Sequence, residues 1–218
     1  MPIAPEAHTV SARQVNKLYF PSKSSSNSRE EQMDAQEKIA LVKERARKNF
    51  SKGFNCAECV LEAVLELVDT GLPREALKLA TGLGGGVGLY GDTCGAIVGA
   101  VLAVGAVHGR SGLPEGEDRK AAAKAAAEQL YGNPGLYRMF NQLPNMIKSK
   151  YGNTLCREIC KQWRDNWLCR EHALHCREII TDSAEIAATI ICGDSNEIMS
   201  KPFGENVENL KDACTGKG

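Results

Sequence analysis

Cysteines and one glycine-rich stretch are the residues of this 218-residue chain whose types and spacing could do chemistry. The stretch begins at Gly82 and runs into Cys94, which opens a segment of small residues. Glycine lets backbone N–H groups approach a bound group closely, and a helix N-terminus lowers the pKa of a thiol. The pattern therefore indicates a reactive thiolate or an anionic metal–thiolate cluster at Cys94.

Eight further cysteines accompany Cys94, so the total of nine is odd and complete intramolecular pairing is impossible. Cys56 and Cys59 form a Cys-x-x-Cys, and Cys156 and Cys160 lie four residues apart on one helical face. Thiols and imidazoles at this density suit zinc or iron. The residues that stay open as additional ligands are Cys59, Cys160, Cys169, His172 and Cys192.

The glycine-rich stretch contains a literal Gly-x-Gly-x-x-Gly at residues 86–91. A dinucleotide fingerprint needs a preceding strand, whereas the pattern here predicts a preceding helix, so nucleotide binding is disfavoured. We expect the N–H groups of this region to bond cluster sulfur and tune its potential. A tight turn between packed helices is the alternative. The residues expected to contact a cofactor are Gly85, Gly86, Gly88, Thr93 and Gly95.

Composition excludes several classes of function. The formal net charge is +0, which gives no reason to expect nucleic acid or an anionic membrane as a partner. No apolar run approaches the length of a membrane-spanning helix. The N-terminal residues lack the basic start and apolar core of a signal peptide. A thioredoxin-like redox pair at Cys56 is disfavoured because no βαβ pattern surrounds it. We expect a cytoplasmic protein, where clustered cysteines serve metal or redox chemistry.

Hydrophobic periodicity predicts an all-α chain, folded as a compact multi-helix bundle with the glycine-rich loop at the metal or redox site. Asn55 is the predicted cap of the second helix, Asp92 or Thr93 that of the fourth, and Pro144 a predicted interruption. The predicted helices cover residues 30–51, 55–68, 73–82, 94–108, 116–131, 136–150, 154–166 and 172–191.

The predicted organisation is an extended N-terminal arm at 1–29, a helical cysteine-rich redox domain at 30–193 and a polar C-terminal tail at 194–218. Pro and Ser dominate the arm, and such a composition buries too little apolar surface to order itself. An apolar patch from Leu18 to Phe20 within the arm is expected to contact a neighbouring surface.

The cysteines and glycines together resemble a known family. The matching segments are Asn-Cys-Ala at 55–57, the glycine-rich loop, Cys-Gly-Ala-x-x-Gly at 94–99, a cysteine after Tyr-Gly-Asn-Thr-Leu at 151–155, and Cys176 before a final helix. This resembles the redox-active proteins named for the pattern C_GCAxxG_C_C. It is also similar to the domain shared with split-Soret cytochrome c, a dimeric protein of anaerobic sulfate reducers. The resemblance covers roughly residues 35–192.

The resemblance implies four cluster ligands, Cys56, Cys94, Cys156 and Cys176. Thr93 stands where the family pattern has glycine, and no haem-attachment motif is present, so no haem is expected. The leading interpretation is an iron–sulfur protein, [2Fe–2S] or [4Fe–4S], that works in electron transfer or redox sensing, with a redox partner protein and as a homodimer. The alternative interpretations are a thiol–disulfide oxidoreductase that uses Cys94 and a structural zinc module. The sequence does not decide whether the protein is an enzyme.

Overall fold

The structure, a computed structural model, describes residues 33–207. The predicted arm at 1–29, with its patch at Leu18, and the end of the predicted tail lie outside the described residues. All the described helices belong to the unit that begins at Ala35. Among the described residues there is no β-strand, only an isolated bridge between Thr93 and Leu155, so the all-α prediction is confirmed.

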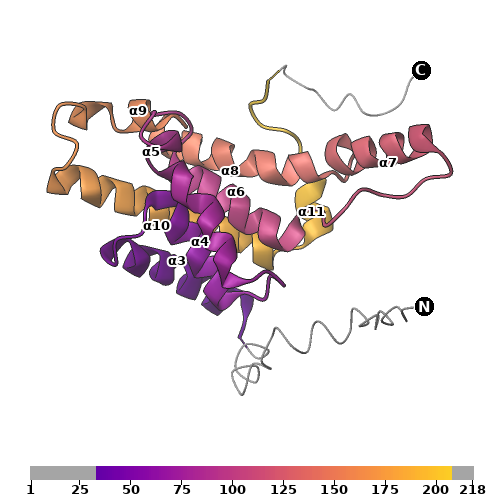
Figure 1. The fold of residues 1–218 in the computed structure, drawn as a ribbon, viewed down its shortest axis with the longest axis horizontal. Coiled ribbons are helices and arrows are strands. Elements are labelled where there is room, and N and C mark those ends of the chain that lie inside the picture. Colours follow the sequence, from indigo (N-terminus) through magenta and orange to yellow (C-terminus); the bar gives the residue numbers. More distant parts are fainter. Residues whose placement is uncertain (1–32, 208–218) are drawn as a thin grey trace, which may run out of the picture. The chain divides into compact units, whose positions relative to one another are not determined.

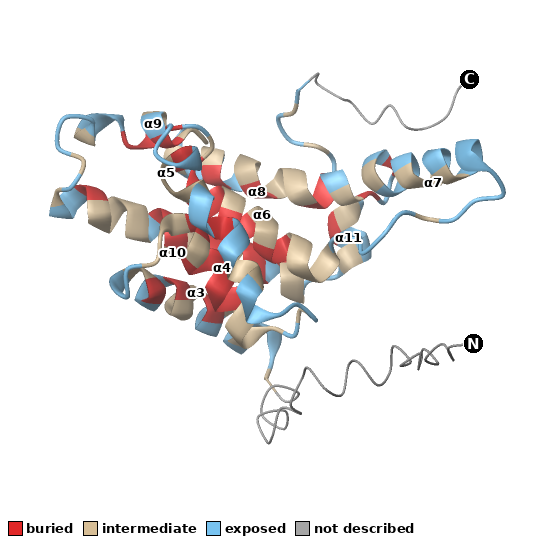
Figure 2. Cartoon of the chain, in the orientation of Figure 1, coloured by how far each residue is buried: buried red, intermediate tan, exposed pale blue. Residues whose placement is uncertain are grey.

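Four helices form the centre of the bundle: α3 (Ala35–Ser51), α4 (Cys56–Leu67), α6 (Gly95–His108) and α10 (Arg170–Cys192). Helix α10 packs against α3, α4 and α6, and α4 packs against α3 and α6 (Figure 1). Each of the four supplies buried apolar side chains, and Figure 2 shows the buried residues gathered where these helices meet. These side chains include Val42, Val60, Val64, Ile97, Val104, Ile179 and Ile180.

The backbones of helices α4 and α6 are in direct contact. A Cβ atom on Gly99 would lie 2.5 Å from the carbonyl oxygen of Ala57 and 2.8 Å from its Cα. Glycine in a helix interior costs about 1 kcal/mol relative to alanine, and this contact explains why α6 accepts that cost. The close approach sets the spacing between the start of α4 and the start of α6, where Cys56 and Cys94 lie.

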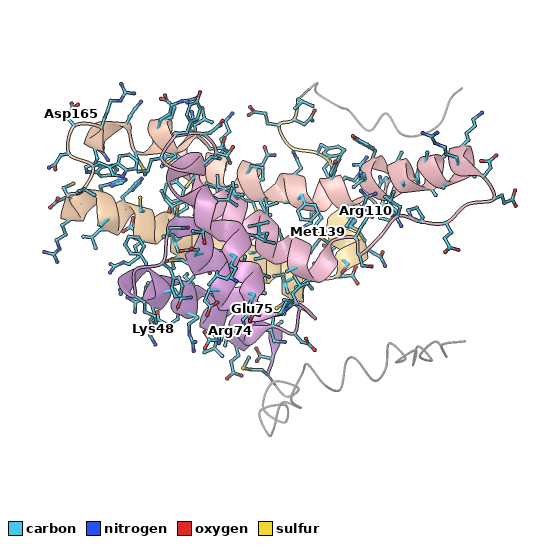
Figure 3. The ribbon with its side chains drawn as sticks, viewed as in Figure 1. Lys48, Arg74, Glu75, Arg110, Met139 and Asp165 are labelled. Atoms are coloured by element: carbon cyan, nitrogen blue, oxygen red, sulfur yellow. The ribbon has the colours of Figure 1, made fainter. Side chains whose placement is uncertain are left out.

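Four further elements lie outside this centre. They are the 3₁₀ helix η1 (Arg74–Leu83), α7 (Arg119–Tyr131), α8 (Leu136–Tyr151) and α11 (Ser195–Met199). Helix α8 packs on α6, α7, α10 and α11, and its Met139, labelled in Figure 3, is fully buried. Helix α7 has no buried residue. None of the described helices is long and apolar enough to cross a membrane.

Helix α11 and the residues after it lie in the region predicted as a tail, and they contact α8. Arg138 on α8 donates to the carbonyl oxygens of Gly132 and Lys201, at 2.9 and 3.2 Å. The backbone N–H of Gly204 donates to Asn141 Oδ1 at 2.8 Å, and that of Glu205 donates to Asn145 Oδ1 at 2.8 Å. Side chains of α8 thus bind the backbone as far as Glu205.

Three predicted details are wrong. Cys94, rather than Asp92 or Thr93, is the residue that precedes the first turn of α6. Helix α8 continues through Pro144, because its buried residues on both sides of the proline hold it to the core. Residues 154–166 form two short turns, α9 (Cys156–Ile159) and η2 (Lys161–Trp163), instead of one helix. The exposed polar residues between Lys161 and Asn166 offer no continuous apolar face.

Candidate metal and redox site

One cavity of about 550 Å³ collects most of the thiols of the described chain. It lies where α4, α6, α9 and α10 meet the short helix α5 (Gly84–Val87). Apart from Asn55 and Thr81, glycine and apolar side chains form the rest of its lining, among them Gly84, Gly85 and Leu89. The cysteine and histidine side chains in its lining, residue types that can bind metal, are Cys56, Cys94, Cys156, Cys160, Cys169, His172 and Cys176.

Cys56 is positioned by the cap of α4. The Asn55 side chain accepts hydrogen bonds from the N–H groups of Ala57 and Glu58, and the Glu58 carboxylate accepts one from the Asn55 N–H. Such a capping box satisfies backbone donors at a helix start and confirms the predicted cap. Asn55 Nδ2 also donates to the carbonyl oxygen of Thr81, at 3.0 Å, which ties this helix start to the segment preceding the glycines.

Backbone hydrogen bonds place Cys94 beside Cys156. The N–H of Cys94 donates to the carbonyl oxygen of Thr154 at 2.8 Å, and the N–H of Cys156 donates to that of Asp92 at 2.7 Å. These bonds flank the bridge between Thr93 and Leu155. Two cysteines that are remote in the sequence are therefore held next to each other by main-chain geometry, which a change of side chain does not easily alter.

The glycine-rich segment before Cys94 turns in the left-handed backbone region. Gly85, Gly86 and Gly88 have φ of 64°, 70° and 60°, as glycine allows. Val87 and Leu89 have φ of 63° and 68°, which costs an L-residue about 1–3 kcal/mol each. The bonds that hold this conformation include one from the Asp92 N–H to the Gly86 carbonyl at 3.1 Å.

This segment brings backbone up to the Cys56 sulfur. The N–H of Gly85 forms a hydrogen bond with the Cys56 side chain. Gly95 also lies against this sulfur, since a Cβ there would stand 2.4 Å from Cys56 Sγ. Only glycine fits at Gly95, because the neighbouring Leu83 carbonyl oxygen would also lie 2.7 Å away.

The side chains from α9 and α10 form a chain of hydrogen bonds. The Cys156 thiol donates to Cys160, and the Cys160 thiol donates to Cys176. Cys176 Sγ lies 3.2 Å from His172 Nε2. The Sγ atoms of Cys160 and Cys176 and one ring nitrogen of His172 all lie within 4.8 Å of one another, close enough to hold a metal ion.

Four of the cavity thiols, those of Cys56, Cys94, Cys156 and Cys160, have a pKa above the ordinary value for cysteine. Burial raises the pKa of Cys56 and of Cys94, and the hydrogen bond to Cys160 followed by burial raises that of Cys156. The bond from Cys156 lowers the pKa of Cys160, but the bond to Cys176 and burial bring it to about 12. The expected lowering at Cys94 is wrong, because this thiol is only 5% exposed and desolvation exceeds the effect of the helix start.

The structure brings together the four cysteines named by the family pattern, and it separates other candidates from them. Cys59 is fully buried, does not line the cavity, and donates its thiol to the Phe54 carbonyl. Cys192 ends α10 and also lies outside the lining. Of the five residues expected at a cofactor, Gly85 and Gly88 line the cavity, whereas Gly86, Thr93 and Gly95 do not.

His172 lines the cavity together with the four cysteines of the family pattern, and its contacts are well defined. Its spacing of four from Cys176 places both side chains on one face of α10, and this spacing alone could have marked it. The ring centroid lies 4.0 Å from that of Trp167 and 5.5 Å from that of Trp163. His175, only three residues on, does not line the cavity.

Residues 54–190 match the model of a family described as "Putative redox-active protein (C_GCAxxG_C_C)". No curated protein and no solved structure matches the chain. The matched segment includes every cysteine and histidine that lines the cavity.

Proposed function

Because the chain belongs to the redox-active protein family named for the C_GCAxxG_C_C pattern, we propose that it binds an iron–sulfur cluster and serves electron transfer or redox sensing. The observation that carries this proposal is the meeting of Cys56, Cys94, Cys156 and Cys176 at one cavity from α4, the start of α6, α9 and α10. Cysteine thiolates are the usual ligands of [2Fe–2S] and [4Fe–4S] clusters. When bound, such a cluster supplies one-electron chemistry at this place.

The residues around the thiols fit an anionic cluster. The Gly85 N–H bonds the sulfur of Cys56. Hydrogen bonds of this kind to ligand sulfur raise cluster potentials and are among the levers by which a protein sets them. The absence of a side chain at Gly95 leaves room for the Cys56 sulfur itself.

A thiol–disulfide oxidoreductase using Cys94 is less well supported. Reactive cysteines are partly exposed and lie in surroundings that favour the thiolate. Cys94 is 5% exposed, and no positively charged side chain lines the cavity. We place the protein in the cytoplasm, where a reducing medium keeps clustered thiols available for metal.

Metal and sulfide analysis of protein purified under strict anaerobic conditions tests the proposal. We expect iron and acid-labile sulfide in similar amounts, a brown colour, and bleaching of that colour by dithionite. Stoichiometric zinc without iron would overturn the proposal and favour a structural zinc module, for which Cys160, His172 and Cys176 provide donors.

The mouth of the cavity suits contact with a redox partner protein. Leu89 and Leu168 line the cavity and are nevertheless 71% and 96% exposed. Exposed apolar residues beside a redox centre allow a partner to approach within electron-transfer distance and exclude water there.

We further propose a homodimer, on the basis of the resemblance to a dimeric cytochrome. Light scattering of the full-length protein at micromolar concentration is expected to give twice the mass of the 23.6 kDa chain. A monomeric mass under these conditions would contradict the proposal.

A further inference from the structure

The tautomer of His172 follows from its hydrogen bonds. Nδ1 lies 2.6 Å from the carbonyl oxygen of Trp167. A carbonyl oxygen only accepts, so Nδ1 carries the proton, and the neutral imidazole then bears its lone pair on Nε2. Nε2 in turn lies 3.2 Å from Sγ of Cys176, which lines the cavity as His172 does.

The position of the ring is fixed as well as its tautomer. His172 is only 6% exposed, and its ring packs against Trp167 and Trp163. A histidine that binds a metal almost always donates its other ring N–H to a carbonyl or carboxylate, which orients the ring. The Trp167 carbonyl performs this role for His172 in the protein as folded.

The neighbouring donors are spaced for a metal. Cys160 Sγ, Cys176 Sγ and the His172 nitrogen lie within 4.8 Å of one another. Metal–donor bonds of about 2.0–2.3 Å put two donors of one tetrahedral ion roughly 3.5 Å apart. Rotation of the thiol side chains covers the difference, and loss of the thiol protons removes the hydrogen bonds that now join Cys160, Cys176 and Nε2.

We infer that His172 is a metal ligand through Nε2, so that the centre has mixed thiolate and imidazole ligation, with Cys160 and Cys176 as the adjoining thiolates. This goes beyond the four cysteines of the family pattern, and it rests on the proposed function only for the identity of the metal. Replacement of thiolate by imidazole at an iron–sulfur centre raises its potential.

Pulsed EPR of the reduced, iron-loaded protein labelled with ¹⁵N-histidine tests this inference. We expect a ¹⁵N coupling of the size that direct ligation produces, lost in His172→Gln. The matched control is His175→Gln, which removes an imidazole of the same helix that packs on Trp163 and does not line the cavity. This control is expected to keep the coupling. Absence of the coupling in the unsubstituted protein, or its persistence in His172→Gln, would overturn the inference.

A second measurement uses Co²⁺ alone and does not depend on iron. Metal-free full-length protein is titrated with Co²⁺, and its proton NMR spectrum is recorded. A bound imidazole whose other nitrogen keeps its proton gives a strongly shifted resonance that exchanges with solvent, and we expect one such resonance, absent in His172→Gln and present in His175→Gln. A Co²⁺ complex without it contradicts the inference. If the protein contains iron but shows no ¹⁵N coupling, the proposed function stands and the inference about His172 fails. If the protein contains no iron but its Co²⁺ complex shows the shifted resonance, the inference stands and the proposed function fails.

Discussion

Replacing Cys94 with serine is expected to strip the protein of iron and to loosen its fold. Serine keeps the size of the side chain but replaces a thiolate ligand by a hydroxyl, which binds iron poorly. Loss of an outer residue that only orients a ligand already costs about 10–100-fold in metal affinity, so we expect at least 100-fold here. Since the proposed ligands come from separate helices, metal affinity would add directly to folding stability, and the variant is expected to unfold at lower denaturant concentration.

Cys192→Ser is the matched control for Cys94→Ser. Cys192 is half-buried at the end of α10 and does not line the cavity. Iron per chain and the denaturation midpoint, measured on both variants prepared anaerobically, are expected to fall for Cys94→Ser alone. Full iron occupancy in Cys94→Ser would show that Cys94 is not a ligand.

Replacing Gly99 with alanine is expected to destabilise the protein by about 3 kcal/mol, at the upper end of what overpacking a core costs. The new methyl group would meet the backbone of Ala57 at 2.5 Å from its carbonyl oxygen, and backbone cannot rotate away. The start of α4 would have to move from α6, and Cys56 with it. Urea unfolding of the metal-free protein isolates the packing effect from metal binding.

Gly105→Ala, on the same helix α6, separates this contact from helix propensity. A Cβ at Gly105 would meet only the Phe140 ring, at 4.0 Å, which is an ordinary contact. Alanine is better than glycine within a helix, so this variant is expected to be more stable by up to about 1 kcal/mol. Equal effects of the two substitutions would contradict the assigned approach of α4 and α6.

Helices with a clear apolar face or cap could be predicted from the sequence. Asn55 marks the start of α4, and the isoleucines of α10 recur at helical spacing. Pro144 misled the prediction because its local cost is met by tertiary packing of α8, which no local pattern contains. The predicted single helix at residues 154–166 is wrong for the opposite reason. The local sequence pattern allowed a continuous helix there, but packing against the rest of the protein did not require one.

The site was predictable where residue type and spacing combine. Cys160 lies four residues after Cys156, and both line the cavity. Cys59 follows Cys56 by three residues but contacts Phe54 instead, because the turn from Cys56 to Cys59 rotates the second thiol into the core. Spacing places residues near one face of a helix, whereas the contacts of the neighbouring helices decide which of them reach the cavity.

The site cysteines are far apart in the sequence, so the ribosome synthesises them at different times. Cys56 and Cys94 are synthesised before Cys156, and Cys176 comes last, about 120 residues after Cys56. At roughly 5–20 residues per second, this interval is on the order of ten seconds, during which the early thiols have no partners from α10. A nascent chain thus presents an incomplete set of the proposed donors until α10 has been synthesised and packs on α3 and α6.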